Sequence, residues 1–367
     1  MPDRDRSPFA APVTMSRRNF VGRSAALMAA FTGGGALLGA CGSSDSSTGS
    51  AESKVDEVTF LNVIPIESIS NTAEMLADAG GHFEKHGLKV TFEATNGSAP
   101  AIQTVIQGSA LITRLGDIET IVAVAQKDAP LVNVGSVEKG GGLLRFISSK
   151  RRPLQKPEDF RGAKMGLPSI GGTSENTLNL VIASGGVPAS SVDRQVVGLT
   201  PGVFDLVSKG RVDGYVVSLD TSLIILRDEP DALSFAPSSV ISAGNQQYTT
   251  SERQLQDPEQ ADQVRRFLLG IHDAIEFVIE DEKNGFEKTM ETISAKYAVP
   301  AFKDKEISRK SLELYVGAWT ADGQDKIVQT NPAVWKATYD EMVDAKIVPG
   351  GMNPADWLTD KFAPAGG

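Results

Sequence analysis

Glycines and small hydroxyl residues cluster in one run of the sequence, between positions 168 and 176. Gly171 and Gly172 have no side chain, so the backbone there can approach a bound molecule closely. Thr173 and Ser174 follow at the expected start of a helix, where hydroxyl and free backbone N–H groups can donate hydrogen bonds to an anion. No Gly-Lys-Ser/Thr follows, which excludes a phosphate-binding P-loop. We predict ligand contact through Ser169, Gly171, Gly172, Thr173 and Ser174; helix capping by Thr173 is a compatible alternative.

Further candidate ligand residues lie at the ends of predicted strands, where parallel α/β sheets bind their ligands. Arg114 is the only basic residue expected at such an end, and it can bind a carboxylate, sulfonate or phosphate with two hydrogen bonds. The alternative for Arg114 is a surface salt bridge to Asp117 or Glu119. Glu67 and Asp220 could instead receive an amine or a ring N–H, so the charge of the ligand stays open. The remaining candidates are Asn96, Gly97, Ser98, Asp117 and Ser218.

Residue types that carry catalysis or bind metals are sparse. His82 and His86 are four positions apart, a spacing that can hold a metal, but neighbouring glycines interrupt the helix that such a site needs. His272 lies beside an apolar stripe and is expected to be structural. No Gly-x-Ser-x-Gly elbow is present. We therefore predict no catalytic residue, no metal and no cofactor.

The first forty residues have the pattern of an export signal. Arg17 and Arg18 form a twin-arginine pair, followed by an apolar stretch over 25–40. As a helix this stretch spans about 24 Å, which is short of the ~30 Å hydrocarbon core of a membrane. Cys41 follows Leu38-Gly39-Ala40 and resembles the lipidated cysteine of bacterial lipoproteins; a stray cysteine after an ordinary signal is the alternative. Residues 42–54 are rich in Ser and Gly. Together with Cys41 they are predicted to form a flexible tether over 41–54.

The composition is that of an acidic globular protein. The chain has 367 residues, 41% of them hydrophobic, which is enough for two lobes that each have a core. The formal net charge is −10, and an acidic surface argues against nucleic acid as a partner.

Apolar runs of strand length alternate with helical runs from residue 55 onwards, which predicts an α/β fold with a mostly parallel sheet. A polar stretch at 150–159 interrupts this rhythm, and the alternation restarts at 163–167. After a return strand near Val240 the chain becomes helical. We predict lobe 1 from residues 55–141 and 243–367 and lobe 2 from residues 142–242; one larger doubly wound sheet is the alternative.

Several short motifs together resemble a known family. They are residues 83–90, 116–117, 158–166, 207–214 and 248–250. Their order and spacing are similar to those of the periplasmic binding proteins for aliphatic sulfonates, taurine, nitrate and thiamine-type pyrimidines. The region 331–348 is more like the pyrimidine-binding branch, whereas the Gly-Thr-Ser run is equally like the sulfonate branch. Leu111 departs from the family, whose members often have an acidic residue there.

The resemblance implies a type II periplasmic-binding fold, in which two α/β lobes enclose a small ligand. It also implies a solute-binding receptor that delivers its ligand to the permease of an ABC importer. With Cys41 acylated, the receptor would be anchored on the extracytoplasmic face of the cell membrane. An exported enzyme, or a binding module for a signalling partner, is the alternative. The Cys-rich motif of the family's enzyme branch is absent, since Cys41 is the only cysteine.

Overall fold

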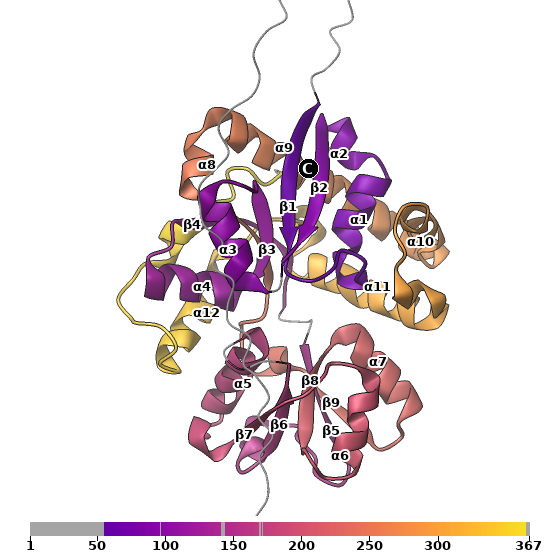
Figure 1. Cartoon of the computed structure of the whole chain (residues 1–367), viewed down its shortest axis with the longest axis vertical. Coiled ribbons are helices and arrows are strands. Elements are labelled where there is room, and N and C mark those ends of the chain that lie inside the picture. Colours follow the sequence, from indigo (N-terminus) through magenta and orange to yellow (C-terminus); the bar gives the residue numbers. More distant parts are fainter. Residues whose placement is uncertain (1–54, 96, 141–143, 169, 171, 365–367) are drawn as a thin grey trace, which may run out of the picture. The chain divides into compact units, whose positions relative to one another are not determined.

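Two separate five-stranded sheets organise the computed structural model, which describes residues 55–95, 97–140, 144–168, 170 and 172–364 (Figure 1). The first sheet has the order β2-β1-β3-β10-β4 and the second β7-β6-β8-β5-β9. This confirms the predicted α/β class and excludes the single larger sheet. The strands of the first sheet are β1 (Asp56–Asn62), β2 (Leu88–Ala94), β3 (Ile112–Gly116), β4 (Leu131–Glu138) and β10 (Gln246–Ser251). Those of the second are β5 (Leu144–Ser149), β6 (Lys164–Leu167), β7 (Asp193–Val196), β8 (Gly214–Ser218) and β9 (Ala232–Phe235).

Each sheet contains one strand that runs against the predicted parallel direction. β10 is antiparallel to both β3 and β4, and β5 is antiparallel to both β8 and β9. These two strands are the first that the chain forms after it passes from one sheet to the other, so they enter from the opposite end. The return strand predicted near Val240 is wrong: the strands there are β9 and β10, and Val240 lies between them.

Helices flank both sheets. They are α1 (Thr72–Ala79), α2 (His82–Lys85), α3 (Ser98–Gln107), α4 (Asp117–Lys127), α5 (Thr173–Ser184), α6 (Phe204–Ser208), α7 (Leu219–Asp228), α8 (Glu252–Gln256), α9 (Pro258–Asp281), α10 (Glu287–Ser294), α11 (Lys305–Trp319) and α12 (Pro332–Asp344). Within the described part of the chain, none of these helices has the length and apolar character needed to span a membrane.

The apolar stripe predicted on α9 forms much of the core under the first sheet. Its members Val264, Phe267, Leu268, Ile271, Ile275 and Val278 are all fully buried. Phe267 stacks on Phe60 of β1 and on Phe83 of α2, with ring centroids 5.3 and 5.0 Å apart. Burying such a side chain stabilises the fold by about 1.5–3 kcal/mol, so the stripe fixes α9 against the sheet.

The predicted lobe boundaries fall between strands of different sheets, and all described residues belong to one compact unit. The division into lobes at these positions stays a prediction. The signal segment 1–40, the acylation site Cys41 and the tether 41–54 lie outside the described residues.

Candidate functional site

A cavity of about 270 Å³ is lined by residues from the elements of both sheets, and we call it the cleft. The carboxyl ends of β1 and β3 contribute to it, as do the first residues of α4, α5 and α7. Six of the predicted ligand residues line the cleft: Arg114, Asp117, Thr173, Ser174, Ser218 and Asp220. The rule that ligands bind beyond the carboxyl ends of strands therefore brought six of the ten candidates that the structure describes to one place.

Other predicted residues lie elsewhere or outside the described residues. Glu67 is exposed, and Glu67, Gly97, Ser98 and Gly172 are not part of the cleft lining. Glu67 lies in the loop after β1, and Ser98 is the first residue of α3. Asn96, Ser169 and Gly171 lie outside the described residues. Several polar lining residues were not predicted from the sequence: Asn62, Ser68, Ser70, Asn71, Gln246 and Tyr315.

Arg114 is held by two buried carboxylates instead of standing free at the cleft. Its Nη1 donates to Oε1 of Glu74 at 3.3 Å and to the carbonyl oxygen of Ser70 at 2.8 Å, and its Nη2 donates to Oε1 of Glu138. Tyr248 donates its hydroxyl to Glu74 Oε1 at 2.8 Å. The alternative of a surface salt bridge to Asp117 or Glu119 is wrong, since the ion-pair partners are Glu74 and Glu138. Since Arg114 already faces two acidic partners, little of its charge remains for an anionic ligand.

Glu138 is the partner with an unsatisfied atom. Its side chain is 1% exposed, and its Oε2 has no hydrogen-bond partner within the described residues. Burial raises the pKa of Glu138 to about 7, although the adjacent Arg114 opposes this shift. The cluster of Arg114, Glu74 and Glu138 thus contains one cation and two carboxyl groups, of which Glu138 releases its proton only near neutral pH.

Asp117 lines the cleft, but its carboxylate is fully used by the backbone. Oδ1 accepts from the N–H groups of Ile118 at 2.8 Å and Gly244 at 3.0 Å, and Oδ2 accepts from the N–H of Asn245 at 3.0 Å. Gly244 has φ 105°, which favours glycine. Asp117 therefore anchors the segment that returns the chain from the second sheet to β10.

The start of α5, where the sequence predicted an anion, is approached by one of the protein's own carboxylates. Thr173 donates its hydroxyl to Oε1 of Glu119, a residue of α4. The residue that precedes the helix is Gly172, which has no side chain to cap it. A carboxylate already placed beside these donors makes the site less favourable for a second anion.

Asp220 is the acidic lining residue that remains available. Asp220 lies in the first turn of α7. Ser218, two positions earlier, donates its hydroxyl to Thr221 at 2.9 Å. Asp220 has no hydrogen-bond or ion-pair partner among the residues that the structure describes. Burial raises the pKa of the nearby Tyr315 well above its usual value, and Glu138 and Asp220 add to this shift.

One group of described residues has the side-chain types of a metal site, and it lies away from the cleft. His272, Asp273 and Glu276 have potential ligand atoms within 4.8 Å of one another. However, Asp273 already accepts from Lys85 at 2.6 Å and from His86 at 3.0 Å. The carboxylate of Asp273 is therefore already engaged by an ammonium group and an imidazole.

Solved structures with the same fold were found among solute-binding proteins. The alkanesulfonate-binding protein SsuA of Xanthomonas axonopodis pv. citri, bound to MOPS, aligns with a TM-score of 0.63 and 15% identity, over 83% of this chain and 99% of that one. The nitrate-binding protein NrtA of Synechocystis PCC 6803 aligns with a TM-score of 0.62 and 10% identity, over 84% and 87%. The desulfurization enzyme DSZB aligns with a TM-score of 0.51 and 13% identity, over 84% and 97%. These likenesses show the periplasmic-binding-protein fold.

A search of curated proteins gave no match. The family model described as NMT1/THI5 like matches residues 69–284, which is more than half of the chain. This range includes every described element from α1 to α9 and thus most of the cleft. The chain belongs to the NMT1/THI5-like family.

Proposed function

We propose that this protein is an extracytoplasmic receptor that captures a small organic solute and delivers it to the permease of an ABC importer. The observation that carries the proposal is the cleft, since Asn62 and Arg114 reach it from the first sheet and Thr173 and Asp220 from elements of the second. A ligand that contacts both sides stabilises one arrangement of them, which is how such a receptor signals that it is loaded. The lining holds no described nucleophile–base pair, which favours binding over catalysis.

The charges around the cleft favour a ligand that donates hydrogen bonds. Arg114 is neutralised by Glu74 and Glu138, and Glu119 lies beside the start of α5. Asp220, in contrast, has an unpaired carboxylate. We therefore propose that Asp220 receives an amine or a ring N–H of the solute, in preference to a sulfonate or nitrate in the same position. An aminopyrimidine has the required donors.

Asp220 provides the test of this function. We expect 4-aminopyrimidines or primary amines to raise the melting temperature of the purified protein, while methanesulfonate and nitrate do not. Asp220→Asn should weaken binding of the active compound at least tenfold, because a charge-assisted hydrogen bond is lost. Calorimetric titration measures this affinity.

Asp231→Asn is the matched control, since Asp231 is 79% exposed and only distantly paired with Lys150. It should bind like the wild type. Binding of nitrate or methanesulfonate that is insensitive to Asp220→Asn would contradict the proposed ligand class. If no small solute changed the melting temperature, the receptor function itself would be in doubt.

We further propose export by the twin-arginine route and acylation of Cys41. Cys41→Ala should yield a folded protein that is released from the membrane, because one acylated cysteine with two or more chains is what retains such a protein. Membrane fractionation and mass spectrometry of the mature N-terminus measure this. A mature N-terminus at another residue, without lipid, would refute the anchor; cytoplasmic retention of the Arg17→Lys, Arg18→Lys double variant would support the export route.

A further inference from the structure

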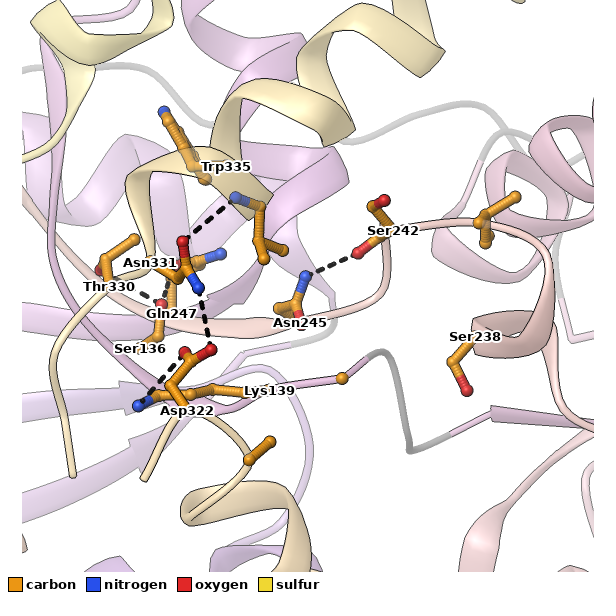
Figure 2. Close-up of a pocket in the computed structure, with 14 residues that line it drawn as sticks. Ser136, Lys139, Ser238, Ser242, Asn245, Gln247, Asp322, Thr330, Asn331 and Trp335 are labelled. Atoms are coloured by element: carbon orange, nitrogen blue, oxygen red, sulfur yellow. Dashed lines mark hydrogen bonds and ion pairs between the residues drawn. The ribbon is translucent and has the colours of Figure 1, made fainter. Parts of the chain in front are cut away.

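A second cavity, of about 300 Å³, lies on the other side of the segment that returns the chain to β10 (Figure 2). We call it the hinge pocket. No residue of this segment lines both cavities. Gly244 and Gln246 line the cleft, whereas Ser242, Asn245 and Gln247 line the hinge pocket. The two linings share no residue, although only this single segment of backbone lies between the two cavities.

Gln247 presents an unused donor to the hinge pocket. The residue is 2% exposed, and its Oε1 accepts from the hydroxyl of Ser136 at 2.7 Å and from the amide of Asn133. These contacts fix the orientation of the side chain. Its Nε2 donates no hydrogen bond to any described residue and is not among the fully buried atoms without a partner, so this donor is open to the pocket. A bound molecule with an acceptor atom would give it a partner.

Two hydroxyl groups face the pocket from the returning segment. Ser238 and Ser242 line it, and their hydroxyls form no hydrogen bond with the part of the chain that the structure describes. The Ser242 backbone is nevertheless held, because its N–H donates to both carboxylate oxygens of Glu341 at 2.8 and 3.0 Å. The hydroxyls are thus available donors on a fixed backbone.

The charged residues of the hinge pocket are already paired. Lys139 is 5% exposed, donates to the carbonyl oxygen of Lys326 and lies 3.6 Å from Oδ2 of Asp322. Asp322 also accepts from the amide of Asn331 at 2.8 Å, as Figure 2 shows. Lys139 and Asp322 neutralise each other, so a charged ligand would lose its hydration without gaining a free counter-charge.

We infer that the hinge pocket binds a small, uncharged carbonyl compound, such as a lactam or an amide, whose oxygen accepts from Nε2 of Gln247. The volume is at the lower end of ligand pockets, which fits a molecule of this size. The site is distinct from the cleft and goes beyond the proposed receptor function. Because the returning segment has one face in each cavity, a ligand in the hinge pocket also alters the backbone that lines the cleft, which couples the two sites.

The probe for this inference is 2-pyrrolidone, titrated into the ¹⁵N-labelled protein and followed by NMR. We expect shifts of the side-chain amide of Gln247 and of the backbone amides of Ser242 and Gly244, with a Kd on the order of 1 mM for so small a probe. The Gln247 amide is assigned by its absence in Gln247→Glu. That variant keeps the acceptor for Ser136 but replaces the donor with a carboxylate, and should weaken binding at least tenfold.

Gln103→Glu is the matched control, because it makes the same change at an exposed glutamine of α3 that lines neither cavity. It should keep the affinity for 2-pyrrolidone within twofold of the wild type. The inference is overturned if the Gln247 amide does not shift in the wild type at tens of millimolar probe, or if both variants lose binding equally. The wild-type titration decides the question even if Gln247→Glu does not fold.

Discussion

Replacing Arg114 with Met is expected to lower the free energy of unfolding by about 3–5 kcal/mol at pH 7, as is typical when one partner of a buried ion pair is removed. Met fills a similar volume but leaves Glu74 and Glu138, which are 0% and 1% exposed, without their cation. Urea denaturation of the purified protein measures the change. The loss should be smaller at pH 5, where the carboxyl groups can take up protons.

Two further variants show whether the loss comes from the carboxylates. The double variant Arg114→Met, Glu138→Gln should recover part of the stability, since one of the two uncompensated charges is then absent. Arg309→Met removes an exposed arginine that lies 3.0 Å from Glu287 and should cost at most about 1 kcal/mol. A loss no larger than that of Arg309→Met would mean that the network around Arg114 contributes little to stability.

Glu138→Gln is expected to flatten the pH dependence of stability between about pH 4.5 and 7. In the folded protein the pKa of Glu138 is about 7, compared with 4.5 for an ordinary glutamate, so the folded state holds a proton that the unfolded state has released. The wild type should therefore be most stable at the acidic end of this range and lose stability as the pH rises. At 1.36 kcal/mol per pH unit, the loss amounts to about 3 kcal/mol.

Glu57→Gln is the control for this pH profile. Glu57 is exposed and its hydrogen bond with Lys89 lowers its pKa, so it titrates below the pH range in question. This variant should keep the wild-type slope. A Glu138→Gln profile that is parallel to the wild type would show that Glu138 is ionised throughout the range.

Periodicity in the sequence was sufficient to predict the α/β class. The stripe on α9 repeats at helical spacing because one face of the helix is buried, and the apolar runs alternate because strands and helices do. The direction of β10 was not predictable in this way, since a strand's residues do not encode which neighbours it pairs with. The strand rule also identified six of the cleft residues, because it depends only on where each strand ends.

The electrostatics of the site were not predictable from the same patterns. Arg114 was identified as a candidate, but its partners lie 40 and 24 positions away, and Glu74 was hidden in an apolar helical run. Glu119 reaches the start of α5 from α4, a contact between elements of different sheets. Such pairs depend on tertiary packing, and they favour a hydrogen-bond donor as ligand, whereas the sequence left the charge of the ligand open.

The position of β10 has a consequence for the order in which the protein folds. β10 lies between β3 and β4 and is hydrogen-bonded to both, yet all strands of the second sheet precede it in the chain. Until residue 251 has been synthesised, β3 and β4 each have an unpaired edge, and such edges promote aggregation. The first sheet can therefore be completed only after all strands of the second have been synthesised, and pairing over so long a sequence separation is slow. Until β10 is available, β4 has no neighbouring strand in this sheet.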